Sequence, residues 1–224
     1  KYGDVFTVRA PRDGAFVIIA APELIKDVFA ASGDVLLAGV GSTASVRGDL
    51  LVDAGTTLSA GLPRIELTGH WSASGAFSAS GATVAFVGPG AQSILSGGTS
   101  FHYLQLASTG GVFWATAVAV SSGVTFSAGV ADLGTATHSL RGFWTAAGGS
   151  YRGSSGTVVL DGTARQHIMG STGSAFGRLV SSNPAGVLLT SDAACDADLD
   201  LLAGVMDISS RTLRLRGNLA RAGT

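Results

Sequence analysis

The chain has 224 residues, of which 46% are hydrophobic and only 13% are charged, with 33 glycines and a formal net charge of −1. Its mean hydropathy of +0.41 is too high for a disordered glycine-rich linker, and the balanced charge leaves no basic stripe for nucleic acid. The longest apolar run, residues 15–21, is much shorter than the roughly 20 residues that cross a bilayer.

Residues 1–41 are predicted to form a small domain of their own. Strands are indicated over residues 2–9 and 15–20, with a turn between them, and a helix over residues 22–29 begins at Pro22. We expect this hairpin and helix to cap the open end of the structure that follows. The chain begins with Lys1 and shows no Lys/Arg-led secretory signal, so we expect a processed form or a segment of a longer product.

This segment resembles the first β-hairpin and the following helix of the haem-thiolate cytochrome monooxygenases. The matching runs are KYGDVFTVR at residues 1–9, PELIKDVF at residues 22–29 and DVLLAG at residues 34–39. In that family a Phe-x-x-Gly run leads to the cysteine that binds haem, whereas Cys195 follows Ser-Asp-Ala-Ala. The family's Glu-x-x-Arg pair is also absent, so the resemblance supplies no site residue and no cofactor.

After this segment the chain contains an internal repeat with a period of about 75 residues. Four landmarks recur at a constant offset of 75, namely Gly111 and Gly186, Gly129 and Gly204, Asp132 and Asp207, and Gly142 and Gly217. Further back the offset slips slightly, to 73 between Trp71 and Trp144 and to 74 between Gln92 and Gln166. Such self-similarity is typical of stacked repeat proteins, and the slips indicate insertions at turns.

Short strands with alternating apolar and small polar residues are predicted within each copy. Val84 and Phe86 share one face, and their counterparts Val158 and Leu160 keep the same parity, which predicts one buried and one exposed row. We therefore predict an all-β fold, a parallel β-helix (β-solenoid) over residues 42–224. Each repeat would span about three coils of about 25 residues. A β-sandwich is the rival fold, but only Asp161-Gly162 has the turn residues that its hairpins require.

From about residue 42 onward the chain resembles the repeats of bacterial adhesins and filamentous-haemagglutinin-like surface proteins. The matching words are Gly-His-Trp at residues 69–71, Thr-Val-Ala-Phe at residues 83–86, Gln92-x-Ile94 and Phe101-x-x-Leu104. The resemblance implies a parallel β-helical stalk of an exported protein, located outside the cell or on its surface.

The densest group of candidate ligands is acidic. Alternating carboxylates would lie on one face of a strand and could hold Ca²⁺, so calcium binding stays an open alternative to a solvated face. The group consists of Asp192, Asp196, Asp198 and Asp200. The equivalent stretch of the preceding copy, residues 117–125, contains no acid.

The remaining candidate residues indicate packing more than chemistry. The histidines have no paired ligand spacing; they are His70, His102, His138 and His167. His138 aligns with Leu213 and Cys195 with Val120, which favours buried structural roles for both. Trp71 and Trp144 could form a sugar-stacking ladder, but core packing is the preferred interpretation. We assign no catalytic, cofactor-binding or metal-binding residue.

The sequence predicts a non-enzymatic, extracellular structural or adhesive β-solenoid, such as a stalk, adhesin or filament subunit. Its partners would be further copies of itself, end to end or laterally, or a surface glycan, with no nucleic acid and no membrane span. Two enzymatic alternatives stay open. One is a remnant or fusion of a haem-thiolate monooxygenase. The other is a carbohydrate-active β-helix such as a polysaccharide lyase, for which Asp196 and Asp198 are the candidates.

Overall fold

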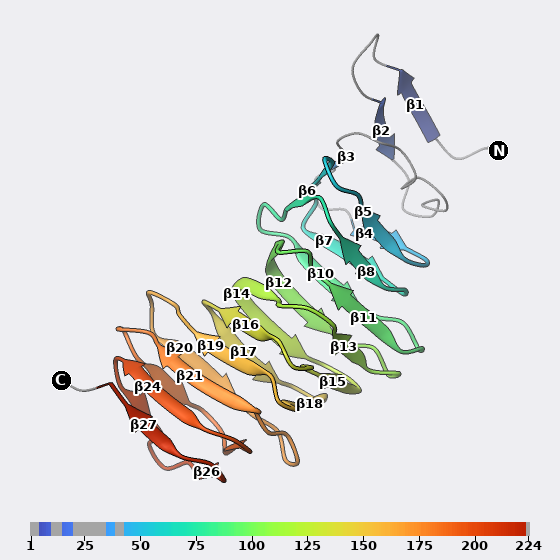
Figure 1. Cartoon of the computed structure of the whole chain (residues 1–224). Coiled ribbons are helices and arrows are strands. Elements are labelled where there is room, and N and C mark those ends of the chain that lie inside the picture. Colours follow the sequence, from blue (N-terminus) through green and yellow to red (C-terminus); the bar gives the residue numbers. More distant parts are fainter. Residues whose placement is uncertain (1–4, 10–14, 20–34, 39–42, 223–224) are drawn as a thin grey trace.

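The computed structural model describes residues 5–9, 15–19, 35–38 and 43–222, and its strands from residue 43 onward stack along one axis (Figure 1). The strand pairings from β3 (Val35–Ala38) onward are parallel, and they join strands of successive coils. The predicted parallel β-solenoid is therefore confirmed, because a sandwich would pair its strands antiparallel.

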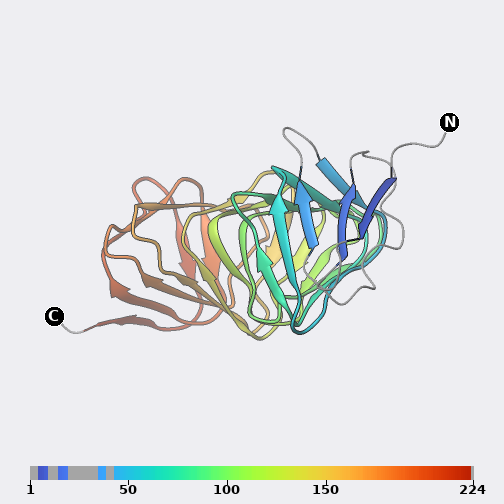
Figure 2. The same cartoon turned by 90° about the horizontal axis from the view of Figure 1, so that it is seen from above.

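The coil has three sides, which are defined here by the strands that pair along each of them (Figure 2). Side 1 contains β4 (Thr43–Val46), β7 (Arg64–Leu67), β10 (Thr83–Phe86), the later parts of β12 (Ser100–Leu106) and β14 (Ala119–Phe126), β17 (Phe143–Ala146), β20 (Gln166–Met169), β22 (Val187–Leu189) and β25 (Met206–Asp207). Side 2 contains β5 (Leu50–Val52), β8 (Trp71–Ala73), β11 (Gln92–Leu95), β13 (Val112–Trp114), β15 (Val130–Asp132), β18 (Ser150–Arg152), β23 (Ala193–Cys195) and β26 (Leu213–Leu215).

Side 3 is continuous with side 1 at two corners, because β12 and β14 begin on side 3 and run around the corner. The other strands of side 3 are β3, β6 (Thr57–Gly61), β9 (Ala76–Ser78), β16 (Thr137–Leu140), β19 (Thr157–Leu160), β21 (Arg178–Ser182), β24 (Leu199–Ala203) and β27 (Leu219–Arg221). Between residues 43 and 222 the chain completes about nine coils. At about 4.8 Å per coil, the stack is roughly 40 Å long.

Each coil is shorter than the sequence suggested. On side 1, Thr83 pairs with Tyr103 and Tyr103 with Gly123, which is an offset of 20 in the chain where the sequence predicted about 25. The offset rises to 23 between Trp71 and Ile94. It rises again to 24 between Trp144 and Ile168, where a corner loop is enlarged. One copy of the repeat thus does not correspond to three whole coils.

The repeat instead spans eleven successive sides, one side fewer than four coils. Trp71 lies in β8 on side 2, whereas its counterpart Trp144 lies in β17 on side 1. In the same way Phe86 lies on side 1 and its counterpart Leu160 on side 3. Equivalent residues are therefore rotated by one side between copies and do not pile into one column. This corrects the expectation of about three coils per repeat.

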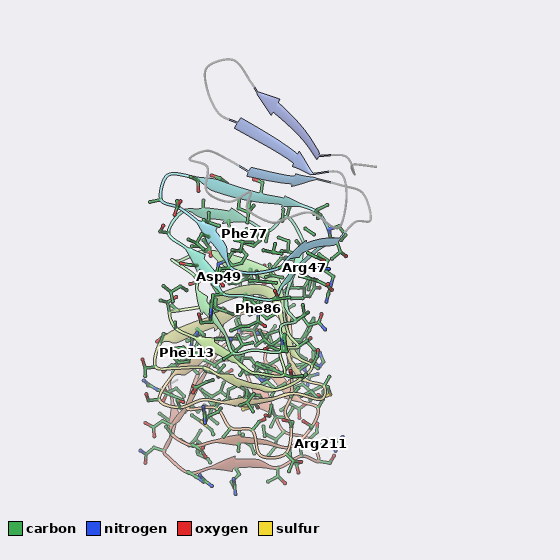
Figure 3. The ribbon with its side chains drawn as sticks, turned by 90° about the vertical axis from the view of Figure 1, so that its right-hand side faces the viewer. Arg47, Asp49, Phe77, Phe86, Phe113 and Arg211 are labelled. Atoms are coloured by element: carbon green, nitrogen blue, oxygen red, sulfur yellow. The ribbon has the colours of Figure 1, made fainter. Side chains whose placement is uncertain are left out.

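The predicted row of inward residues forms the core, as the stacked side chains show (Figure 3). Val84, Phe86, Val158 and Leu160 are all buried, which confirms the predicted inward row. The opposite row is not exposed throughout, because Ala85 is also buried. Removal of such apolar side chains from water contributes roughly 1.5–3 kcal/mol for each residue. The outward rows carry mainly small polar residues. This explains why only 13% of the chain is charged.

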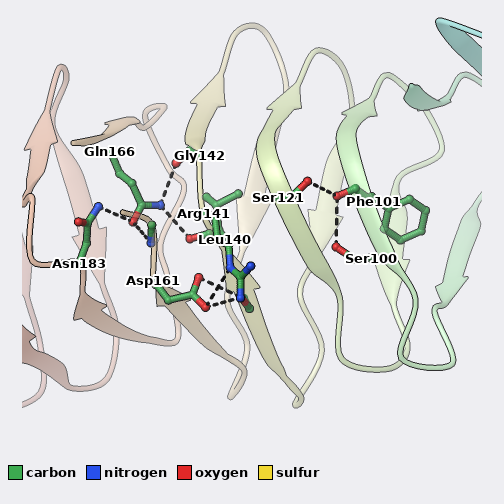
Figure 4. Close-up of polar contacts among 11 residues, drawn as sticks. Ser100, Phe101, Ser121, Leu140, Arg141, Gly142, Asp161, Gln166 and Asn183 are labelled. Carbon is green, nitrogen blue, oxygen red and sulfur yellow. Dashed lines mark hydrogen bonds and ion pairs between the residues drawn. The ribbon is translucent and has the colours of Figure 1, made fainter. Parts of the chain in front are cut away.

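Buried glutamines hold the two enlarged corners. Gln166 Nε2 donates to the carbonyls of Leu140 at 2.8 Å and Gly142 at 2.9 Å, and its Oε1 accepts from Gly162 N at 2.9 Å (Figure 4). These bonds satisfy backbone groups of the preceding coil and of the loop itself, which would otherwise be buried without partners. The glutamine that recurs in the sequence is thus a structural corner residue.

Part of the N-terminal prediction lies outside the described residues. β1 (Val5–Arg9) and β2 (Ala15–Ile19) pair antiparallel, as a hairpin requires. The predicted helix over residues 22–29 is not among the described residues, so the capping role of residues 1–41 stays a prediction. Within the described part of the chain, no helix has the length and hydropathy of a membrane span.

Candidate functional site

The acidic group at Asp192–Asp200 does not converge on one point. Asp192 Oδ1 accepts from Thr212 N at 2.8 Å, and Asp198 Oδ1 accepts from Asn218 N at 2.8 Å. Asp196 lies 3.0 Å from Arg216 Nη1. Each of these carboxylates thereby joins its own coil to the next one.

Asp200 is the buried member of the group, with 7% of its surface exposed. Its Oδ2 accepts from Arg178 Nε at 2.9 Å, on the neighbouring coil. Residues 196–198 form the corner between β23 and β24, so the alternation of a single strand does not apply to them. Among the described residues, no three His, Cys, Asp or Glu side chains gather as metal ligands would.

The histidines are as scattered as their spacing predicted. His70 Nδ1 contacts Ser93 Oγ at 2.9 Å, and His102 contacts the hydroxyl of Ser121 at 3.2 Å. His167 is exposed on β20. None of these contacts includes a carboxylate that would orient an imidazole for catalysis.

His138 is a buried structural residue, as its alignment with Leu213 predicted. Its Nδ1 accepts from Val118 N at 3.1 Å, and its Nε2 donates to Leu133 O at 2.6 Å. Burial lowers the pKa of His138, and the bond to the Leu133 carbonyl only partly opposes this effect. The neutral tautomer with hydrogen on Nε2 satisfies both backbone groups. His138 therefore connects the turn after β15 to the start of β14.

The aromatic and thiol candidates also belong to the interior. Trp71 and Trp144 are 0% and 1% exposed, so they pack in the core and do not form an outer sugar-binding ladder. Cys195 is fully buried, and burial raises the pKa of its thiol. It is a small core residue, as its alignment with Val120 predicted.

A wide surface hollow of about 860 Å³ lies on side 2 near the last coils. Its lining includes the loop at residues 170–175 and the side chains of Asp192, Asp196, Arg214 and Arg216. Because Asp196 is already paired with Arg216, the hollow does not present two free carboxylates of the kind that acid–base hydrolysis uses.

Asp132 and Asp207, which are landmarks of the sequence repeat, form ion pairs on the surface. Asp132 Oδ2 lies 2.7 Å from Arg152 Nη2, and Asp207 Oδ2 lies 2.6 Å from Arg165 Nη2. Their recurrence at an offset of 75 was the available signal. The sequence did not reveal their arginine partners, which lie 20 and 42 residues away along the chain.

No protein-family model, curated protein or solved structure matches the chain at a significant level. The chain combines an apolar core, held by repeated corner contacts, with outward rows and loops that are exposed to solvent.

Proposed function

We propose that the chain is a non-enzymatic scaffold, a rigid segment of a stalk, adhesin or filament that acts outside the cell or on its surface. The observation that carries the proposal is the parallel ladder along side 1, which continues without interruption from β4 to β25. Main-chain hydrogen bonds between successive coils make such a stack stiff along its axis. The outward rows and corner loops would carry the contacts.

The chemistry of the polar residues supports the same proposal. The aspartates of the Asp192–Asp200 group each bind a group of a neighbouring coil, and the buried His138 joins two backbone segments. These side chains stabilise the stack, which is the role expected of polar residues in a scaffold. The resemblance to adhesin-type repeats agrees with an exported stalk.

Self-association is part of the proposal. Strand edges at the ends of a parallel stack favour the addition of further strands. End-to-end or lateral contact between copies would then lengthen or thicken the rod. Sedimentation at increasing protein concentration should show growing assemblies, and a constant monomer would count against this part.

The scaffold proposal is tested by the shape and location of the full chain. Small-angle X-ray scattering should give an elongated particle, and antibodies should label intact source cells without permeabilisation. A Soret absorption band would instead support the haem-thiolate alternative. Cleavage of pectin-like or alginate-like polymers that is lost in Asp196→Asn or Asp198→Asn would support the lyase alternative. Either of these results would contradict the proposal.

A further inference from the structure

Two shallow surface grooves occur at equivalent positions of the two repeat copies. Groove A, of about 320 Å³, lies on side 2 and is lined by Ala91, Gln92, Thr109–Phe113, Gly129, Val130, Asp132 and Arg152. Groove B, of about 500 Å³, lies on side 1 and is lined by Arg165, Pro184–Gly186 and Val205–Ser209. The linings correspond across the offset of 75, with Thr109 matching Pro184 and Val130 matching Val205.

The floors of the two grooves have the same backbone geometry. Gly111 and Gly186 both have a φ of +87°, and each lies under the carbonyl of the exposed valine of the next coil. Gly111 N donates to Ser108 O at 3.2 Å, and Gly186 N donates to Asn183 O at 3.0 Å. The repeat therefore rebuilds the same groove floor on a different side of the solenoid, with Gly186, Val205 and Asp207 in place of Gly111, Val130 and Asp132.

Each groove has an apolar part that is open to solvent. In groove A the side chains of Phe113 and Val130 are both 47% exposed. In groove B Val205 is 71% exposed and Ile208 is 42% exposed. The exposed valine recurs in both copies, and a second apolar side chain from a different position of the repeat, Phe113 or Ile208, enlarges each apolar part. Such an exposed apolar surface, on outward rows that are mostly small and polar, is the type of feature that marks an interaction site.

Each groove also has an ion pair at its rim, in which the aspartates are counterparts but the arginines are not, since Arg152 follows Asp132 by 20 residues and Arg165 precedes Asp207 by 42. Burial alone would raise the pKa of Asp132, but hydrogen bonds from Gly134, Ser154 and Arg152 outweigh this effect and lower the pKa. Hydrogen bonds from Ser209 and Arg165 lower the pKa of Asp207. Both carboxylates are thus ionised at neutral pH and are neutralised by their arginines. Each rim offers an acceptor and a donor side by side, without a net charge.

We propose that grooves A and B, which share a floor and the same combination of apolar side chains and an ion pair, are two binding sites for a neutral oligosaccharide. A sugar ring combines an apolar C–H face with adjacent hydroxyl groups that both donate and accept, which matches an exposed apolar side chain beside a carboxylate–guanidinium pair. A charged ligand gains little, because each ion pair is already internally neutralised. The inference rests on the proposed scaffold function and specifies the ligand that such a scaffold would hold.

The rotation of the repeat determines how the two sites act together. Eleven sides correspond to a shift of about 18 Å along the axis at about 4.8 Å per coil, and to a rotation by one side. The two grooves thus face different directions and bind separate glycan chains. On a dense glycan layer, simultaneous binding of both would raise the apparent affinity well above that of either site.

The proposal is tested by isothermal titration calorimetry of the full chain with three hexasaccharides in turn. They are cellohexaose, laminarihexaose and maltohexaose. We expect at least one hexasaccharide to bind with two sites per chain. Phe113→Ser with Arg152→Ala should remove one site, and Val205→Ser with Arg165→Ala should remove the other. The combined variant should show no binding, and its retention on an immobilised form of the glycan should fall at least tenfold.

Leu51→Ser is the matched control, because Leu51 is also 47% exposed on side 2 but lies outside both grooves. It should keep both sites. Failure of all three hexasaccharides to bind, or binding that survives in the combined variant, would overturn the proposal. Binding of sulfated or uronic acid oligosaccharides alone, or groove-dependent self-association, would also overturn it. An elongated particle in scattering would leave the scaffold function intact in each of these cases.

Discussion

The two copies of the repeat use the same contacts on different sides of the solenoid. The ring centroids of Trp71 and Phe101 are 5.0 Å apart, and those of their counterparts Trp144 and Phe176 are also 5.0 Å apart. Yet Trp71 lies on side 2 and Trp144 on side 1. The three sides are therefore interchangeable, because the same short sequence forms the same corner and the same core contact on whichever side it lies.

The copies differ in how firmly the enlarged corner is held. In the first copy Ser108 Oγ donates to Gly90 O at 2.9 Å. In the second copy Asn183 replaces this serine, and its Nδ2 donates both to Ala164 O at 2.7 Å and to Gln166 Oε1 at 2.9 Å. The second corner thus has an additional link between two buried amide side chains.

The largest expected effect comes from the core tryptophans. Trp71→Ala and Trp144→Ala should each destabilise the fold by about 3–5 kcal/mol, because both remove a fully buried aromatic ring from the core. Urea unfolding followed by circular dichroism measures the loss. Phe143→Ala is the control, since this neighbour of Trp144 points outward and should cost about 1 kcal/mol. A much smaller effect at one tryptophan would refute the equivalence of the sides.

The corner glutamines sharpen the comparison between the copies. Gln92→Met and Gln166→Met keep the side-chain length but leave two carbonyls and one N–H without their partner, which should cost about 3 kcal/mol. The loss should be greater at Gln166, because Asn183 also loses an acceptor there. Thermal unfolding of the two variants in parallel would show the order, and equal losses would argue against a role for Asn183.

The turn glycines should respond alike in both copies. Gly129 and Gly204 have φ values of +63° and +70°, and an added Cβ would lie 2.1 Å and 2.0 Å from a backbone carbonyl oxygen. We expect Gly129→Ala and Gly204→Ala each to cost about 2 kcal/mol, since the strained backbone and the close contact act together. Gly90→Ala should be neutral, because nothing lies near its Cβ position. Denaturant midpoints for the three variants would provide the test.

The smallest effect is a dependence on pH in one copy only. Because burial lowers the pKa of His138 below 6.5, the unfolded chain binds the proton first as the pH falls. The contribution of His138 is therefore fully present above about pH 6.5 and is lost as the pH falls towards the lowered pKa, by at most about 1.4 kcal/mol for each pH unit. His138→Leu introduces the residue that the second copy has at Leu213.

The test is to measure the free energy of unfolding of the native chain and of His138→Leu between pH 7.5 and pH 5. The difference between the two proteins should change with pH in this interval. A constant difference would show that His138 is not the titrating group. The ring nitrogens of His138 contact the backbone groups of Val118 and Leu133, and the indole of Trp114 packs against the ring. None of these three neighbours is charged, which simplifies the interpretation.

The candidate site illustrates why a pattern in sequence does not translate directly into a cluster in space. Asp196, Asp198 and Asp200 alternate as they would on a strand, but Asp196 and Asp198 lie in the corner before β24 and only Asp200 lies in the strand. Conversely, Asp132 and Arg152 meet across neighbouring coils because β15 and β18 pair in register. The register depends on coil length, which the alternation of apolar residues does not reveal.

The amino-acid sequence alone determined the parallel solenoid, the inward rows, the internal repeat and the burial of Trp71, Trp144 and His138, because period-two hydrophobicity and recurring landmarks are local properties. Only the tertiary structure decided the length of each coil and the rotation of each copy by one side. The reason is that β12 runs through its corner between Phe101 and Tyr103 without a glycine or a proline, so the number of sides in a repeat is set by how the coils stack.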